Sequence, residues 1–331
     1  MNSLCSVYSI LGIQEYELVK LKEREKFIKD GYFVSLNNTK TPIGVFDTPS
    51  IDNLIEQCSK IHNKNNEFVR IGLEVLEKVD IGNIQSNIKT EDRALVQIAS
   101  NFNCLEVAMT TDPANGCLVD NYAHTATQGP AASFGVLSAS LYRAHFVPLN
   151  GLGQTKTNQI NLLSNVKKYF GDPINGKIMP EEMINTEIIN DVDAVAKQIK
   201  VGVHYDAPIM FGRPPTTIHT RTLNGENVYK LPEPYQVTDQ ILCSTINLAR
   251  YDLNYIYNNT SIEKLARACL RASYEGAYLT AIARNRKKMF LTLVGGGVYN
   301  NPKDIIINEL FRAHNKWSFM SNLEHVYLCT N

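Results

Sequence analysis

The first 93 residues show hydrophobic positions at helical spacing. Residues 15–29 are charged with apolar residues at intervals, and residues 51–79 repeat Ile, Leu and Val at mixed steps of three and four. Such steps place apolar side chains on one face of a helix. No pattern in this segment indicates chemistry, so we predict that residues 1–93 form a helical extension packed on the core.

A different pattern begins at residue 94 and continues to the C-terminus, where short apolar runs alternate with longer stretches of helical period. The expected strands are 95–99, 201–205, 240–243, 289–294 and 325–329. The expected helices are 129–143, one from 191, one from 260 that opens with the capping-box spacing of Thr260 and Glu263, and 302–316. Alternation of this kind predicts an α/β fold with a largely parallel sheet covered on both faces, in one core domain of residues 94–331.

Composition narrows the class of partner. Among 331 residues, 33 Lys and Arg balance 33 Asp and Glu. No overall field therefore attracts nucleic acid or a membrane surface, and we expect neither as a partner. The seven cysteines show no C-x-x-C pair or zinc spacing. We therefore expect a reducing, cytoplasmic location, no cofactor and metal-independent chemistry, with delivery into a host cell left open.

The strongest expected strand runs into three glycines, Gly295, Gly296 and Gly297, and a helix follows from Pro302. Glycines let a ligand approach the main chain, and a helix start offers unpaired N–H donors. This combination suits a diphosphate, although tight packing of strand on helix explains it equally well. The loop lacks the Lys-Ser/Thr ending of a P-loop and the G-x-G-x-x-G spacing of a dinucleotide fold.

A second polar loop, TQGP at residues 127–130, also leads into an expected helix. Loops that follow parallel strands meet at the carboxyl ends of those strands, where ligands of open α/β sheets bind. Two such loops could hold one diphosphate from both sides. An ordinary helix start is the alternative explanation for this segment.

Several segments together resemble a known family. The run QIASNFNCLE at 97–106, the TQGPAAS segment, LYR at 141–143 with FVP at 146–148, and FLTLVGGGVYNNP at 290–302 are similar to the macrodomain-like ADP-ribosyl hydrolases. The nearest subset includes bacterial effectors that act on ADP-ribosylated ubiquitin, and the family is distantly related to poly(ADP-ribose) glycohydrolase. The resemblance is patchy before Arg93 and runs in order from there to the C-terminus.

The resemblance implies a macrodomain-like fold that binds ADP-ribose or an ADP-ribosylated protein, with ubiquitin as a candidate. The GGGVYNN loop would wrap the diphosphate and distal ribose, and the amides of Asn101 and Asn103 would serve ribose hydroxyls. Structural capping by these asparagines, and core packing of Tyr299, are the alternatives. The expected ligand-binding residues are Asn101, Asn103, Thr125, Thr127, Gln128, Gly129, Pro130, Asp206, Gly295, Gly296, Gly297, Val298, Tyr299, Asn300 and Asn301.

Cleavage of a glycosidic link requires a carboxylate near the distal ribose. Asp112 and Asp120 lie between the ASNFN and TQGP segments, and Glu275 resembles a family glutamate, although pairing with Arg143 or Arg271 is favoured for it. The family has an acid where this chain has Thr125, beside His124. Three hypotheses therefore stay open, namely an ADP-ribosyl hydrolase, a non-catalytic ADP-ribose reader, and an unrelated nucleotide enzyme such as a methyltransferase.

Overall fold

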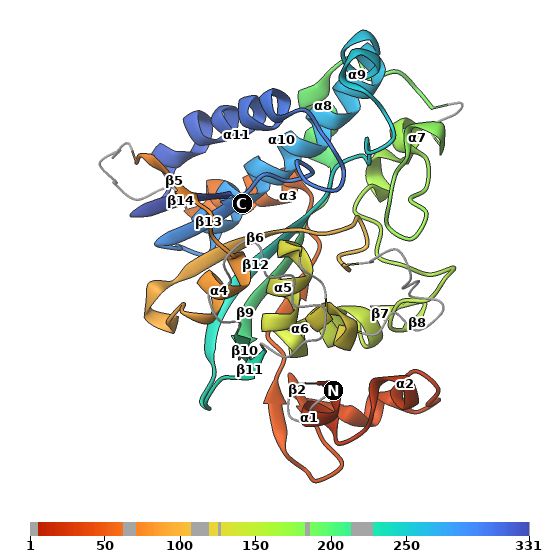
Figure 1. Ribbon diagram of the computed structural model, residues 1–331, viewed down its shortest axis with the longest axis vertical. Coiled ribbons are helices and arrows are strands. Elements are labelled where there is room, and N and C mark those ends of the chain that lie inside the picture. The colour runs from red at the N-terminus through yellow and green to blue at the C-terminus, as the bar shows by residue number, and fades with distance from the viewer. Residues whose placement is uncertain are drawn as a thin grey trace.

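The computed structural model describes residues 6–61, 71–106, 119–124, 127–182, 186–212 and 228–330. Its centre is a seven-stranded sheet in the order β4-β9-β12-β6-β13-β14-β5 (Figure 1). The strands are β4 (Val45–Asp47), β5 (Leu73–Glu77), β6 (Ala94–Ala99), β9 (Gly202–Ile209), β12 (Gln236–Cys243), β13 (Lys288–Thr292) and β14 (His325–Thr330). The five strands from β12 to β5 are parallel, whereas β9 and β4 run antiparallel at one side. The expected α/β class with a largely parallel sheet is confirmed.

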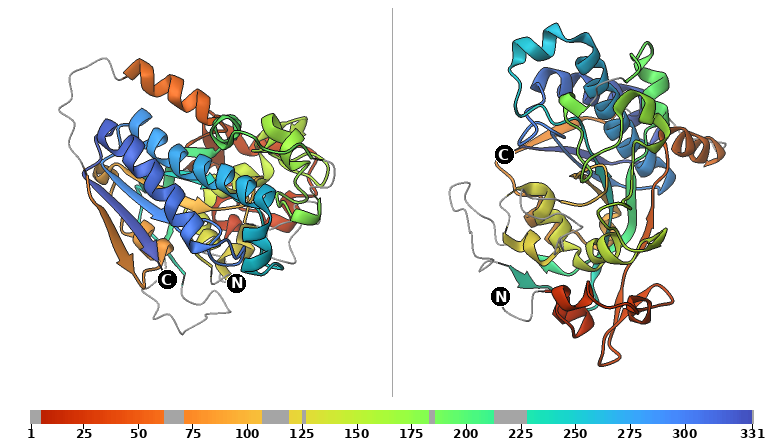
Figure 2. Two further views of the ribbon diagram at one scale, coloured as in Figure 1. Left: turned by 90° about the horizontal axis from the view of Figure 1, so that it is seen from above. Right: turned by 90° about the vertical axis from the view of Figure 1, so that its right-hand side faces the viewer.

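Helices cover both faces of this sheet. One face carries α3 (Ile51–Ile61), α8 (Val192–Gln198), α10 (Thr260–Ala283) and α11 (Lys303–Trp317), with α10 and α11 side by side (Figures 1 and 2). The other face carries α4 (Ile81–Ser86), α5 (Gln128–Gly135) and α6 (Leu137–His145). The main hydrophobic core lies between the sheet and these layers. Among the described residues, no helix is long and apolar enough to span a bilayer.

The first 93 residues contain more than helices, which corrects the prediction for this segment. Strand β4 forms one edge of the sheet and β5 forms the other. The apolar steps of residues 51–79 divide into helix α3 and the edge strand β5, whose short alternating pattern is easily read as helical. Both edge strands belong to the seven-stranded sheet of the core. A separate folding unit that ends at residue 93 stays a prediction.

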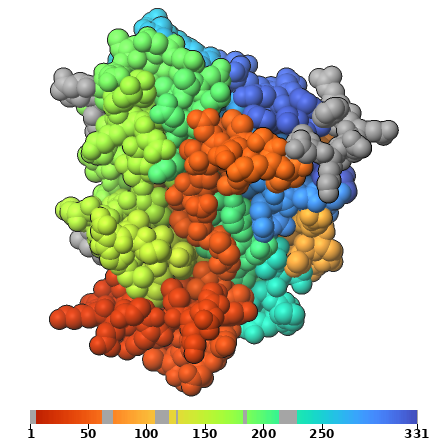
Figure 3. Space-filling view, turned by 180° about the vertical axis from the view of Figure 1, so that it is seen from behind, coloured from red at the N-terminus to blue at the C-terminus, as the bar shows by residue number. Residues whose placement is uncertain are grey.

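Residues 6–43 form a small layer of their own. It contains α1 (Val7–Leu11), α2 (Glu15–Leu18), η1 (Arg24–Phe27) and the three-stranded sheet of β1 (Ile28–Lys29), β2 (Tyr32–Val34) and β3 (Lys40–Pro42). A second hydrophobic cluster joins this layer to α6, with Phe33 edge-on to Phe146 at 4.9 Å between ring centroids. Seen from behind, the layer covers one end of the molecule and α3 lies across the surface above it (Figure 3).

Two expected helices differ from the structure in detail. The stretch 129–143 is divided into α5 and α6 at Val136, whose φ of −114° and ψ of 54° leave the helical region. Helix α10 begins at Thr260 as expected, but Asn259 caps it by accepting a hydrogen bond from the Ile262 N–H at 3.2 Å. Asparagine is a favourable N-cap because its short side chain reaches the free N–H groups of the first turn.

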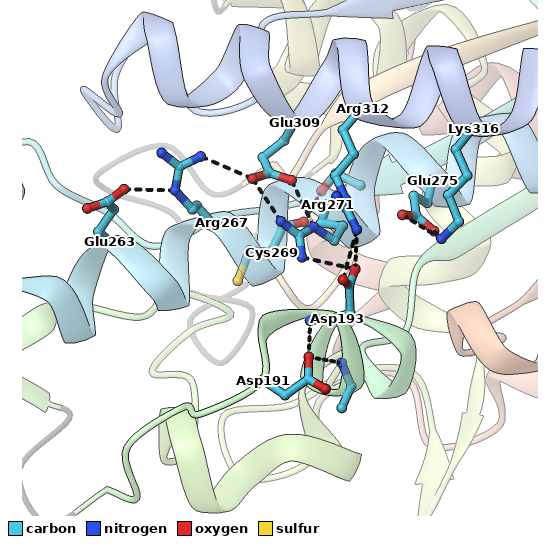
Figure 4. Close-up of polar contacts among 12 residues, drawn as sticks. Asp191, Asp193, Glu263, Arg267, Cys269, Arg271, Glu275, Glu309, Arg312 and Lys316 are labelled. Atoms are coloured by element: carbon cyan, nitrogen blue, oxygen red, sulfur yellow. Dashed lines mark hydrogen bonds and ion pairs between the residues drawn. The ribbon is translucent and has the colours of Figure 1, made fainter.

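Buried ion pairs join the helices of the covering layer (Figure 4). Glu309 on α11 is 3% exposed and accepts from Arg271 at 2.9 Å and from Arg267 at 3.1 Å. Arg271 also contacts Asp193 on α8 at 3.0 Å. Each buried charge in this layer has an opposite partner, which is the condition under which burial of charge is tolerated.

Replacing Glu309 by glutamine tests this pairing. The variant leaves two partly buried guanidinium groups without their shared carboxylate, so we expect a loss of about 2–3 kcal/mol in the free energy of unfolding. Glu263→Gln is the matched control, because Glu263 pairs with the same Arg267 within one helix and should cost only about 0.5 kcal/mol or less. Urea unfolding of both variants measures the difference, and equal losses would contradict the assignment.

Candidate functional site

The carboxyl ends of three neighbouring parallel strands, β12, β6 and β13, lie at the same end of the sheet. Strand β6 pairs in parallel register with β12 on one side and with β13 on the other. The segments that follow these strands, residues 244–248, 100–106 and 293–302, therefore start side by side. Polar residues of these three segments form the candidate site, at the position where ligands of such sheets bind.

The loop after β13 is held in shape by Asn301. Its side chain is 3% exposed, accepts from the Thr245 hydroxyl at 3.3 Å and donates to the Ile246 carbonyl at 3.0 Å. Gly295 has a φ of +75°, and a Cβ there would lie 2.2 Å from the Thr245 side chain. Asn301 therefore uses its amide inside the loop, and Gly295 allows the loop to pack against the segment after β12.

Three consecutive main-chain N–H groups of this loop, those of Gly297, Val298 and Tyr299, donate to no residue that the structure describes. Val298 is 71% exposed, and a Cβ built on Gly297 would meet nothing within 4 Å. Consecutive free N–H groups with open space above them form a typical site for an anion. The flanking Gly296 and Asn300 N–H groups are used inside the loop, at 3.0 Å each.

Tyr299 joins this loop to the segment after β6. Its hydroxyl donates a hydrogen bond to Asn101 Oδ1, and its carbonyl accepts from the Leu248 N–H at 2.8 Å. Burial, and then the negative charge of Glu106, raise the pKa of Tyr299. One tyrosine thus contacts the segments that follow β6 and β12 and lies close to a buried carboxyl group.

Helix α5 starts directly against the end of β6. A Cβ on Gly129 would lie 2.7 Å from the Ala99 carbonyl oxygen and 2.6 Å from Glu106 Oε2. The Gly129 N–H donates to no described residue, while Ala131 N donates to the Thr127 carbonyl at 3.3 Å. Because β6 and β13 are neighbours, the two glycine-containing loops, 127–130 and 295–301, lie at the same edge of the sheet.

Glu106 is the functional candidate that sequence reasoning missed. It is 8% exposed, and its Oε1 has no hydrogen-bond partner among the described residues. Burial raises the pKa of its carboxyl to about 8, and the positive charge of Arg143 works against that shift. In the sequence, the only indication of a buried acid is that Glu106 directly follows the apolar Cys104 and Leu105. Its place in the site is shown by the contact with Gly129. At neutral pH this group is a buried proton donor.

Arg143 is fully buried on α6 and forms no ion pair with any described carboxylate. It donates to the Cys104 carbonyl at 3.3 Å and to Ser140 Oγ at 3.0 Å, and it contacts His204 Nδ1 at 3.2 Å. Burial, and then the charge of Arg143, lower the pKa of His204 to about 3, so this histidine is neutral. Its Nε2 donates to the Ile43 carbonyl at 2.8 Å, which leaves Nδ1 as the acceptor for Arg143.

Two of the expected site residues lie elsewhere in the fold. Glu275 accepts from Lys316 at 2.9 Å and Trp317 at 3.1 Å, near the last turn of α11 (Figure 4). The glycine loop precedes the first turn of α11, about 20 Å away at 1.5 Å per residue. The expected pairing of Glu275 with Arg143 or Arg271 is therefore wrong. Asp206 forms ion pairs with Arg284 and Arg286 near the amino ends of β6 and β12, at the opposite edge of the sheet.

Asp120 is buried, but its carboxylate faces the N-terminal layer. It lies in η4 (Val119–His124), and Oδ1 accepts from the Val7 N–H at 2.7 Å. Burial and the nearby charge of Glu15 raise the pKa of Asp120 to about 7. Asp112 and Thr125 lie outside the described residues.

The remaining expected residues divide into structural and exposed positions. Asn103 is fully buried, donating to Gln159 at 3.0 Å and accepting from the Leu105 N–H at 3.1 Å, so its amide serves the fold. Thr127 is the N-cap of α5 without a side-chain cap bond, and Gln128 donates to the Val79 carbonyl at 3.5 Å. Pro130 is buried at the start of α5.

No protein-family model and no curated protein matches the sequence. Among solved structures, poly(ADP-ribose) glycohydrolase from Thermomonospora curvata is similar at 12% identity and a TM-score of 0.46, over 96% of this chain and 90% of that one. The enzyme from Deinococcus radiodurans in complex with ADP-ribose is similar at 12% identity and a TM-score of 0.45, over 86% and 87%. TM-scores below 0.5 do not establish a shared fold, so this likeness adds no support to the site described above.

Substitution of Gly129 by alanine tests the contact on which the site depends. The new methyl group would meet a backbone oxygen and a buried carboxyl, so we expect the free energy of unfolding to fall by about 1–3 kcal/mol. Gly297→Ala is the matched control from the other loop, where open space predicts a change within about 0.5 kcal/mol. Denaturant unfolding measures both, and an unchanged Gly129→Ala protein would refute the placement of α5.

Proposed function

We propose that this protein is a macrodomain-type hydrolase that binds ADP-ribose and cleaves its glycosidic link to a protein or small-molecule acceptor. The observation that carries the proposal is the row of free N–H groups at Gly297, Val298 and Tyr299, beside the start of α5. Free N–H groups and helix starts bind phosphate oxygens through hydrogen bonds and partial positive charge. A diphosphate spans both features when they lie at one edge of a sheet.

In this proposal the distal ribose extends from the diphosphate toward Tyr299, Asn101 and Glu106. Cleavage passes through an oxocarbenium-like state, and the leaving atom needs a proton. Glu106 donates that proton as the glycosidic bond breaks, and its carboxylate then takes a proton from the water that attacks the sugar carbon. A carboxyl group with a pKa of about 8 is protonated at neutral pH, as this order of events requires.

A reader module that binds ADP-ribose without cleaving it is the alternative, suggested by Thr125 where the resembling family has an acid. The buried Glu106 supports the hydrolase, because its Oε1 has no hydrogen-bond partner among the described residues and a buried polar atom without a partner costs stability. Asp112 stays a candidate for a second acid. The resemblance of the sequence to ubiquitin-directed hydrolases makes ADP-ribosylated ubiquitin the first protein substrate to test, with the cytoplasm, reached by synthesis or by delivery, as the proposed location.

Replacement of Glu106 by glutamine tests the role of the acid. The variant keeps the shape of the side chain and removes the proton, so we expect kcat for release of ADP-ribose to fall by about 10²–10⁴-fold. The Kd for ADP-ribose should stay within about threefold, because the phosphate-binding N–H groups are unchanged. Calorimetry and a release assay measure the two quantities.

Glu74→Gln, an exposed substitution on the edge strand β5, is the control and should match the wild type in both assays. Binding of ADP-ribose by the wild type without release from any modified substrate would select the reader. A wild-type protein that does not bind ADP-ribose would reject both functions.

A further inference from the structure

A chain of hydrogen bonds runs from the N-terminal layer, through η4, to Glu106. We propose that Glu15 and Tyr122 are positioning residues that hold Glu106 in its buried state, so that the N-terminal layer is part of the catalytic machinery. This inference rests on the proposed function for its catalytic meaning. The geometry that carries it is independent of the substrate.

The first link is Glu15 on α2, which is 1% exposed although it is a carboxylate. Its Oε1 accepts from the Val119 N–H at 2.8 Å, and its Oε2 accepts from the Asp120 N–H at 3.0 Å. His145 Nε2 on α6 lies 2.7 Å from Oε1. One side chain of the N-terminal layer therefore satisfies the first two N–H groups of η4, and it fixes this short helix against α6.

A second bond runs in the reverse direction. Asp120 Oδ1 accepts from the N–H of Val7, the first residue of α1, at 2.7 Å. The layer and η4 thus hold each other through a carboxylate from each side. Buried carboxylates are expensive unless hydrogen-bonded, so this arrangement is intolerant of displacement.

The last link is Tyr122, also in η4 and 3% exposed. Its hydroxyl accepts a hydrogen bond from the main-chain N–H of Glu106 at 3.0 Å. This bond fixes the backbone of the residue whose carboxyl lies against Gly129. Movement of η4 would therefore move Glu106 relative to the start of α5 and to Tyr299.

The described charged and titratable groups near Glu106 come from four segments. They are Arg143 on α6, Tyr299 after β13, Cys104 on its own segment and Tyr122 on η4. Of these, only Arg143 carries a full charge at neutral pH. Among the described groups none is an anion that raises the pKa of Glu106, so its protonated state depends on burial, to which η4 contributes through Tyr122.

The test is the pH profile of kcat for Tyr122→Phe. Loss of the hydroxyl frees the Glu106 backbone and admits water, so the pKa of the carboxyl falls toward its ordinary value. Because the acid must be protonated, the decline of kcat at high pH moves down by about one pH unit or more, and kcat at pH 8 falls about fivefold or more. A general loss of folded protein would lower the rate equally at every pH and leave the midpoint unchanged.

Glu15→Gln is the second variant. The amide NH₂ of the new glutamine cannot accept a hydrogen bond, so one of the two bonds from the Val119 and Asp120 N–H groups is lost. The pH profile of kcat should therefore shift in the same direction. Tyr16→Phe and Glu17→Gln, both exposed on the same helix, are the matched controls and should keep the wild-type midpoint. Superimposable profiles for Tyr122→Phe and the wild type would overturn the inference.

Titration of Glu106 by carboxyl NMR separates this inference from the proposed function. If the pKa of Glu106 is lower in Tyr122→Phe than in the wild type, and the wild type releases no ADP-ribose, the results support positioning and reject the hydrolase. Release of ADP-ribose by the wild type, with a Glu106 pKa that is the same in both proteins, would support the hydrolase and reject positioning.

Discussion

The absence of a side chain at Gly129 is the constraint on which the candidate site depends. It lets the first turn of α5 approach the end of β6, with the Ala99 carbonyl and the Glu106 carboxyl in the space that a Cβ would occupy. The same approach brings the Gly129 N–H to the end of the sheet where Gly297, Val298 and Tyr299 present N–H groups that donate to no described residue. The proposed anion site and the proposed acid therefore adjoin each other through one close approach of the chain at Gly129.

Buried charges in this protein follow two different rules. In the layer of α8, α10 and α11, Glu309 and Arg271 are neutralised by opposite charges within ion-pair distance. At the other face, Arg143 has only neutral hydrogen-bond partners, and Glu106 has an oxygen without a described partner. The first arrangement is what stability alone selects. Departure from it beside the two glycine loops is the pattern expected of a functional site.

The sequence was sufficient to predict the elements with strong periodicity. Helix α10 is predictable because its apolar positions repeat over 24 residues, and strand β13 because it is a continuous apolar run directly before the glycines. The edge strand β4, with three residues, offers no such repeat, and β5 follows a helix with similar apolar steps. The positions of the two glycine loops were also predictable, since each precedes a helix start that the sequence indicates.

The acids could not be predicted in the same way, because the environment of a carboxyl depends on residues distant in the chain. Glu275 meets Lys316 and Trp317, and Asp120 meets Val7 and Glu15, partners that no local pattern indicates. Glu106 ends the QIASNFNCLE run, but the surroundings of its carboxyl are set by Gly129 and Arg143, which lie further along the chain. Local sequence thus predicts where glycine-containing loops follow strands better than it predicts the surroundings of a carboxyl group.

The site also sets how stability varies with pH. Glu106 and Asp120 both have pKa values raised on folding, from 4.5 to about 8 and from 3.8 to about 7. In each case the folded state keeps its proton while the unfolded chain loses it, so the stabilising contribution is complete below about pH 4 and is lost as pH rises through the folded value. At neutral pH, the raised pKa of the Glu106 carboxyl in the folded state therefore lowers the free energy of unfolding. The hydrogen bonds between the N-terminal layer and η4 contribute to the stability of the folded state and so act against that loss.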